Sequence, residues 1–132
     1  MLNRIRSVLP EETELVVTRT IECAVRVHEE LGPGYLEGLY QDALCIELGM
    51  EGLAFDRELA VTVHYRGRPL RAQRLDLVVE KQVLVELKAT TRMEPIYQAQ
   101  VLSYLKSTGL RVGLLMNYHD RMFRGSIKRF VL

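Results

Sequence analysis

Two carboxylates and a lysine lie close together in an alternating stretch between Arg74 and Lys88. Apolar and polar residues alternate there, which predicts two β-strands joined by a turn near Lys81. A reversal at that point places Asp76 directly across from Glu86, where like charges destabilise a sheet. At about 4 Å and an effective dielectric constant near 20, the bare repulsion is on the order of 4 kcal/mol. A hard divalent cation such as Mg²⁺ or Mn²⁺ would relieve it, because these ions prefer oxygen ligands.

The same alternation assigns side chains to the two faces of the predicted sheet. Lys88 follows Glu86 by two residues and therefore shares the face of the carboxylates. The opposite parity is apolar and comprises Leu75, Leu77, Val79, Val83, Val85 and Leu87. The alternative is a solvent-facing pair, in which Asp76 and Glu86 splay apart or are matched by an arginine such as Arg74.

Two helices precede this stretch and one follows it. Apolar residues such as Leu15 and Val17 recur at helical spacing over residues 11–31, and a second helix is predicted over about residues 36–49. A third helix is predicted over about residues 95–107, with a proline in its first turn. These helices would cover the faces of a sheet.

The sheet itself is predicted from period-two alternation. One strand covers residues 59–65, a turn follows, and the next strand starts near residue 70. The apolar run at 112–117 is typical of a strand covered on both faces, and residues 127–132 form a final strand or tail. The order predicts an α/β sandwich, in which an antiparallel meander and a crossover strand form a mixed central sheet flanked by helices.

Length and composition are those of an ordinary globular protein. The chain has 132 residues, 48% of them hydrophobic and 27% charged, so residues 1–132 are expected to form a single domain. No apolar run approaches the roughly 18–20 residues that span a bilayer. Residues 1–6 lack the hydrophobic region of a signal peptide, so a cytoplasmic location is the default expectation.

The cysteines, histidines and basic residues carry weaker signals. Cys23 and Cys45 lack C-x-x-C spacing, so buried free thiols are expected rather than a disulfide or a metal site. The three histidines have no ligand spacing and are expected to be structural or exposed. Net charge is only +1, but basic residues cluster in one hairpin (Arg66, Arg68, Arg71 and Arg74) and near the C-terminus (Arg121, Arg124, Lys128 and Arg129). Such clusters are either solvated surface or phosphate-facing.

Three motifs resemble those of known nucleases. Asp76, nine intervening residues and then Glu86-Leu87-Lys88 match the D-x(n)-(D/E)-x-K core of the PD-(D/E)xK nuclease superfamily, although leucine replaces the proline that often precedes the first acid. Gln100 to Tyr104 fit the QxxxY motif of RecB-like nucleases. Gly34 to Tyr40 read G-x-x-E-x-x-Y, so the chain resembles the GxxExxY family of that superfamily over roughly residues 20–118. The resemblance implies a restriction-endonuclease-like fold and metal-dependent cleavage of nucleic acid.

The resemblance also implies roles for the acids and the lysine. Asp76 and Glu86 would bind the cation together with the backbone carbonyl of Leu87. Glu37 would be the additional acid that the superfamily supplies from a helix, and Glu30 is the competing candidate. Lys88 would orient or help to deprotonate the attacking water and stabilise negative charge in the transition state.

Further residues are candidates for contact with nucleic acid. Gln100 and Tyr104 form one helical stripe that Tyr97 continues. Gln100 would hold the Lys88 ammonium or a phosphate, and the tyrosines would touch the nucleic-acid backbone; the alternative is ordinary helix amphipathicity. Tyr40 either contacts the site or packs in the core, and Arg74 belongs to the basic hairpin.

Together these observations favour a Mg²⁺- or Mn²⁺-dependent nuclease that acts on DNA. The alternative is a non-cleaving module of nuclease fold that binds nucleic acid or a partner protein, for example within a defence or repair assembly. A small domain has little surface for holding a duplex, so a homodimer is also expected.

Overall fold

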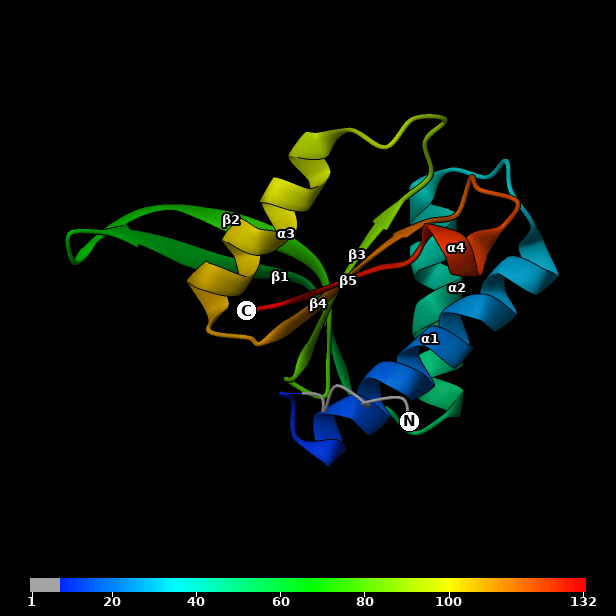
Figure 1. The fold of residues 1–132 in the computed structure, drawn as a ribbon, viewed down its shortest axis with the longest axis horizontal. Coiled ribbons are helices and arrows are strands. Elements are labelled where there is room, and N and C mark those ends of the chain that lie inside the picture. Colours follow the sequence, from blue (N-terminus) through cyan, green and yellow to red (C-terminus); the bar gives the residue numbers. More distant parts are fainter. Residues whose placement is uncertain (1–7) are drawn as a thin grey trace, which may run out of the picture.

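A five-stranded β-sheet with helices on both faces forms the centre of the protein (Figure 1). The structure is a computed structural model that describes residues 8–132. Residues 1–6, on which the expected lack of a signal peptide depends, lie outside the described residues. In chain order the elements are α1 (Glu11–Leu31), α2 (Glu37–Met50), β1 (Phe55–Tyr65), β2 (Arg68–Val79), β3 (Val83–Lys88), α3 (Pro95–Thr108), β4 (Val112–Asn117), α4 (Phe123–Ser126) and β5 (Lys128–Val131).

The predicted order of elements is confirmed, with two differences. The strand predicted over 59–65 begins at Phe55, and the short helix α4 was not predicted because four residues carry no periodic signal. β1, β2 and β3 form the expected antiparallel meander, and α3 then crosses over so that β4 pairs parallel to β3. β5 adds antiparallel to β4 at the far edge. The predicted mixed sheet flanked by helices is thus confirmed.

Hydrophobic side chains of the sheet pack into two cores. The core between the sheet and the α1–α2 layer includes Leu77, Val85, Leu87 and Met116. The core between the sheet and α3 includes Val78, Leu84, Val101, Leu105 and Leu115. β3 and β4 are therefore covered on both faces, as the apolar run at 112–117 predicts.

In β1 and β2, side chains of one parity change from one face of the sheet to the other at the point where Glu58 lies beside Asp76. Glu58 has a φ of +55°, a left-handed conformation that interrupts the regular alternation of a strand. As a result, Leu75 packs in the α3 core, whereas Leu77 packs in the α1–α2 core. The prediction that Leu75 and Leu77 share one face is therefore wrong, because the alternation does not continue through this kink.

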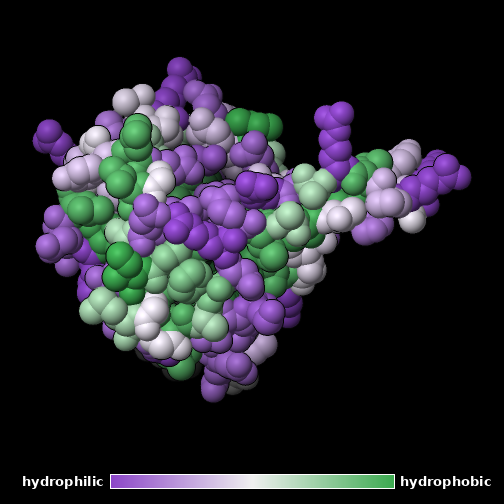
Figure 2. Space-filling view, turned by 180° about the vertical axis from the view of Figure 1, so that it is seen from behind, coloured by the Kyte–Doolittle hydropathy of each residue, from purple (hydrophilic) through white to green (hydrophobic). Residues whose placement is uncertain are grey.

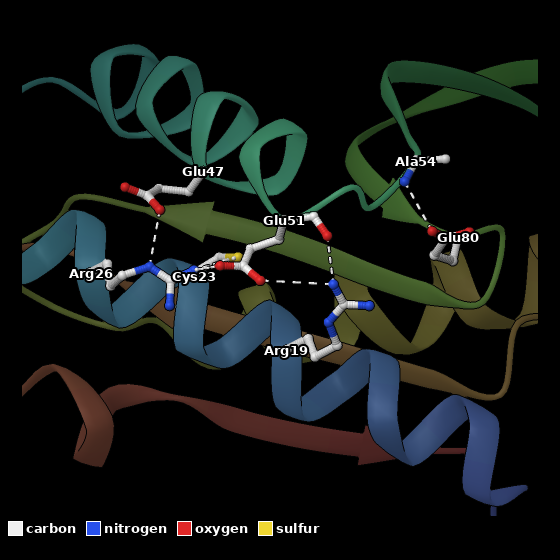
Figure 3. A network of polar contacts seen from close by, with 7 residues as sticks. All are labelled: Arg19, Cys23, Arg26, Glu47, Glu51, Ala54 and Glu80. Atoms are coloured by element: carbon white, nitrogen blue, oxygen red, sulfur yellow. Dashed lines mark hydrogen bonds and ion pairs between the residues drawn. The ribbon is translucent and has the colours of Figure 1, made fainter.

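A set of polar contacts fixes α2 against α1 (Figure 3). The Arg26 guanidinium donates to Glu47 Oε2 at 3.0 Å and to Glu51 Oε1 at 2.9 Å. Arg19 donates to the backbone carbonyl of Glu51 at 2.5 Å. Partly exposed pairs of this kind contribute at most about 1 kcal/mol each. Their consequence is geometric, because they set the direction of α2, whose first residue is Glu37.

Not every apolar residue of the first two helices is buried. In α1, Val17 of the predicted stripe is buried together with Val16, whereas Leu15 is exposed. In α2, Tyr40, Leu44 and Leu48 are buried. Other apolar residues of α2 and of the position before it are exposed, namely Leu36, Leu39, Ile46 and Met50. Figure 2 shows hydrophobic side chains among hydrophilic ones on the side of the molecule where α2 lies.

The cysteines and histidines follow their predictions. Cys23 is buried, Cys45 is partly buried, and both are free thiols. The His28 ring stacks on Phe123 with a centroid distance of 4.8 Å, while His64 and His119 are exposed. Among the described residues, no helix is both long and apolar enough to cross a membrane.

Candidate active site

Asp76 and Glu86 lie opposite one another where β2 and β3 separate. The register that pairs Leu77 with Val85 is the predicted one, and regular backbone pairing stops there. Beyond it, the carboxylates take the place of the backbone acceptors. The Asp76 N–H donates to Glu86 Oε1 at 3.0 Å, and the Leu87 N–H donates to Asp76 Oδ2 at 2.9 Å. The two side chains thus fill the space between the strands and neither splays toward solvent.

Burial makes ionisation of this pair unfavourable. Glu86 is only 5% exposed, and burial, followed by repulsion from Asp76, raises the pKa of Glu86 to about 8. Burial also raises the pKa of Asp76, although the hydrogen bond from Leu87 opposes the shift. Arg74 makes no ion pair within residues 8–132, so the alternative in which arginine matches the acids is not observed. Ionisation of both acids is therefore unfavourable, and a bound cation would offset this cost.

Lys88 ends β3 beside the acids. Its positive charge lowers the pKa values of both Asp76 and Glu86, which requires the ammonium to lie near them. The Lys88 Nζ also lies 4.5 Å from the ring centroid of Tyr97, a cation–π distance. The Lys88 backbone carbonyl accepts a hydrogen bond from the Tyr118 N–H at 2.8 Å, which fixes the end of the strand. The predicted grouping of Asp76, Glu86 and Lys88 is present.

Glu37 joins this group from the first turn of α2. Burial raises the pKa of Glu37, repulsion from Asp76 raises it further, and attraction to Lys88 opposes the shift. The structure gives Glu30, the competing helical acid, no described interaction with Asp76, Glu86 or Lys88. Of the two candidates, Glu37 is therefore the one that α2 carries to the acid pair.

Glu58 is a further acid that the motifs do not contain. It lies in β1 between the residues that pair with Leu75 and Leu77, so its register position is opposite Asp76. Its charge raises the pKa values of Asp76 and Glu37, which requires it to lie close to both. The guanidinium of the neighbouring Arg57 donates its hydrogen bonds to Gln41 and Asp42 of α2 rather than to Glu58. Three adjacent strands and one helix therefore each present a carboxylate.

Two tyrosines of α3 lie in the same region, with Gln100 between them. Tyr97 contacts Lys88, as described above, and burial together with the charges of Glu86 and Asp76 raises the pKa of Tyr104. Gln100 lies between the two tyrosines on the helical stripe and is partly buried. Its side chain makes no hydrogen bond within residues 8–132, so it is available to a bound group.

Tyr40 and Arg74 lie outside this group. Tyr40 is fully buried; its ring stacks on Tyr118 with a centroid distance of 4.4 Å, and its hydroxyl donates to the Gly32 carbonyl at 2.5 Å. Of the two alternatives left open by the sequence, the structure therefore places Tyr40 in the core, where it holds the loop that leads to Glu37. Arg74 is exposed on β2, two residues before Asp76.

The donors fit a hard cation, although no three-residue metal cluster is preformed. Within residues 8–132, no three His, Cys, Asp or Glu side chains are arranged to hold a metal ion. Mg²⁺ does not require such a cage, because it keeps several waters and binds one or two carboxylates together with substrate phosphates. Glu86, which is buried, and Asp76, which is partly buried, both have raised pKa values and supply oxygen donors for such an ion. Lys88 is the cation beside them.

The site is open rather than enclosed. Glu37 and Glu58 are exposed, and Lys88 and Tyr104 are half-buried. A cavity of about 330 Å³ lies elsewhere, between β1 and the end of α3, and it is lined by Leu59, Val61 and Leu110 among others. An open row of acids beside a lysine can receive a phosphodiester of a long polymer, which an enclosed cavity cannot.

The fold and the motif together define the class of protein. A mixed sheet with the D…ExK residues on its second and third strands, flanked by helices, is a restriction-endonuclease-like architecture. The family model of the PD-(D/E)XK nuclease superfamily matches residues 14–130, so the chain belongs to that superfamily. Nucleases of this superfamily typically use divalent metal ions. No match was found among curated proteins or among solved structures.

Proposed function

We propose that the protein is a metal-dependent nuclease that hydrolyses phosphodiester bonds in DNA. The observation that carries the proposal is a pair of adjacent carboxylates, Glu86 buried and Asp76 partly buried, whose pKa values are raised and whose neighbour is Lys88. Placing two adjacent acids away from water is costly for folding. A bound cation would offset this cost by neutralising the two carboxylates.

Asp76 and Glu86 would hold Mg²⁺ or Mn²⁺, with the Leu87 carbonyl as a further ligand and Glu37 acting directly or through water. When bound, the ion would lower the pKa of a coordinated water and neutralise charge on the scissile phosphate. Glu58, opposite Asp76, adds negative potential and is a candidate for a water-mediated contact. We also propose membership of the GxxExxY family, on the basis of Gly34, Glu37 and Tyr40.

Lys88 would position the attacking water and stabilise the charge that develops on the phosphate. The Lys88 ammonium lies over the Tyr97 ring, which holds it on the α3 side of the acids. Gln100 and Tyr104 would contact the substrate backbone on the α3 side, and Arg74 would contact it on the β2 side. Tyr40 supports the site from within the core.

Metal-dependent cleavage is the first testable outcome. Incubation of the protein with supercoiled plasmid, linear duplex and single-stranded DNA should give cleavage with Mg²⁺ or Mn²⁺ and none with excess EDTA. Duplex RNA serves as the comparison substrate, and agarose and denaturing gels report the products. If a gel-shift assay shows DNA binding while no substrate is cleaved with either ion, the non-cleaving binding module becomes the better description.

We further propose a homodimer that forms through α2. Four exposed apolar residues follow one another at intervals of 3, 7 and 4 positions, namely Leu36, Leu39, Ile46 and Met50. This is the spacing of the a and d positions along which two helices of a coiled coil pack. Two facing copies of this stripe would bury on the order of 1,000 Å² in total, near the lower limit for a specific interface. A second copy is the occupant that such a self-complementary stripe fits best.

Replacing Ile46 by glutamate is expected to convert the dimer to a monomer, because a charge would then be buried in the helix pair. Light scattering after size-exclusion chromatography gives the mass. Ile96→Glu is the matched control, since Ile96 is 58% exposed on α3 and Ile46 is 64% exposed on α2. A wild-type protein that stays monomeric at micromolar concentration would rule out this interface.

A further inference from the structure

The hairpin of β1 and β2 extends beyond the body of the protein as a two-stranded arm. Figure 1 shows it projecting to one side, and Figure 2 shows it as a narrow extension with a hydrophilic tip. Its base is anchored, because Val61 packs in the α3 core and Gln73 hydrogen-bonds Ser103 and Ser107 of α3. Beyond these anchors, residues 62–72 form the arm, and all of them except Val63 are exposed.

The arm adds little to the core. A two-stranded hairpin without a packed face is marginally stable in water. Its opposite strands pair from Thr62 with Ala72 to Tyr65 with Arg68, and the turn at Arg66 and Gly67 has both residues in the left-handed region. A reason other than packing is therefore needed for keeping the strands this long.

The charge of the arm supplies a reason for its length. Residues 59–75 contain four arginines and no acid: Arg66, Arg68, Arg71 and Arg74. All four are exposed, and none makes an ion pair or a side-chain hydrogen bond within residues 8–132. By contrast, several arginines on the body of the protein are paired with carboxylates, as Arg26 is with Glu47, Arg57 with Asp42 and Arg129 with Glu14. The four arginines of the arm and its base have no such partner within residues 8–132, and no acid lies among them in the sequence.

The two faces of the arm near its base also differ. Leu59, Val61 and Leu75 point toward α3, so the alternate residues Ala60, Thr62, Ala72 and Arg74 point to the other side. Three of these four are small, which leaves that side of the ribbon flat. At the tip, Tyr65 and Leu70 are 62% and 55% exposed between the arginines. A flat basic ribbon fits a groove lined by phosphates.

We propose that the arm of residues 62–72, with Arg74 at its base, grips duplex DNA beside the active site. A two-stranded ribbon, whose strands are about 4.8 Å apart, enters a major groove about 12 Å wide. Along β2, Arg68 near the tip of the arm lies roughly 25 Å from Asp76 in the active site. Its arginines would therefore bind phosphates on the same duplex whose backbone lies at the acids. The inference rests on the proposed function, since it takes DNA to be the substrate.

Shortening the arm tests the inference directly. Because Thr62 pairs with Ala72, residues 63–71 are replaced by Asn-Gly, the preferred two-residue hairpin turn. Binding is measured in EDTA by fluorescence anisotropy on a duplex of two helical turns, over a range of salt concentrations. The variant is expected to bind at least about 10-fold more weakly, with a salt slope lower by about 2.7, because three arginines are removed.

A double variant with a matched control guards against misfolding of the shortened protein. Arg68→Gln with Arg71→Gln removes two charges from the arm, and Lys81→Gln with Lys106→Gln removes two exposed charges from the body. The arm pair should weaken duplex binding and lower the salt slope by about 1.8, while the body pair should change both much less.

The outcomes separate this inference from the proposed function. Bis(p-nitrophenyl) phosphate is a substrate too small to reach the arm from the active site. Its hydrolysis with Mn²⁺ should therefore be unchanged in the arm variants. If the wild type binds duplex through the arm but hydrolyses nothing, the arm is supported and the nuclease proposal fails. Equal duplex binding by the arm and body variants, an equal loss for single-stranded DNA, or absence of duplex binding by the wild type would overturn the arm proposal.

Discussion

Replacing Lys88 by alanine is expected to lower DNA cleavage by roughly 10²–10⁴-fold while metal binding persists. The ammonium lies beside Asp76 and Glu86 and contacts the Tyr97 ring, so its removal takes away the cation that faces the attacking water and the phosphate. It does not remove an oxygen donor. Single-turnover cleavage of plasmid and calorimetric titration with Mn²⁺ measure the two properties separately.

The controls assign the effect to position rather than to charge. Lys81→Ala removes an exposed lysine from the β2–β3 turn and should cleave like the wild type. Asp76→Asn should lose both cleavage and Mn²⁺ binding, because it removes a proposed ligand. If Lys88→Ala cleaves at the wild-type rate, or loses Mn²⁺ binding as Asp76→Asn does, the role proposed for Lys88 is incorrect.

The pairing of Asp76 with Glu86 could be predicted because its cause is local. Glu80 and Lys81 both have positive φ, and the Gln82 N–H donates to the Val79 carbonyl at 2.9 Å, which makes a tight turn. A reversal this short between two alternating segments leaves one register in which both bury their apolar side chains. Sequence alone therefore sufficed to bring the two acids together.

Glu58 could not be found in this way, because its position depends on an irregularity. At the tip of the arm, Tyr65 pairs with Arg68. If this register continued without change along β1, Arg57 would lie opposite Asp76. The register shift between Thr62 and His64 moves β1 by one residue and brings Glu58 there instead. No residue type in the arm signals that shift, so the fourth acid became visible only in the folded structure.

The sequence also could not predict which side of α2 is buried. Apolar residues occur all around this helix, so periodicity does not single out one face. Tyr40 is buried because it stacks on Tyr118, which follows β4, and α1 covers the neighbouring turns. Contacts between segments so distant in sequence leave no pattern within α2 itself.

Replacing Glu86 by glutamine is expected to stabilise the metal-free protein at pH 8 and to have little effect at pH 5. The folded protein raises the pKa of Glu86 to about 8, above its ordinary value of 4.5. Between these two pH values the folded state binds more protons than the unfolded state, so stability falls as pH rises through this window. Glutamine resembles the protonated acid and removes that loss. At pH 8 the gain should be about 2 kcal/mol or more, which corresponds to roughly 7 °C or more in Tm.

Thermal unfolding in excess EDTA at several pH values between 5 and 8 measures this difference. Glu22→Gln is the control, since Glu22 is exposed on α1 and should give no pH-dependent difference from the wild type. A difference between Glu86→Gln and wild type that stays constant with pH, or a variant that is less stable at pH 8, would contradict the raised pKa.

The same titration connects stability to the proposed cation. Because Glu86 must lose its proton before its oxygens can bind a metal ion, Mg²⁺ should raise the Tm of the wild type and release about one proton per ion below pH 8. Affinity should then rise about tenfold for each pH unit up to that value. Glu86→Gln has no such proton to lose, so Mg²⁺ should raise its Tm little at any pH. The variant that is most stable without metal should therefore be the one that gains least from it.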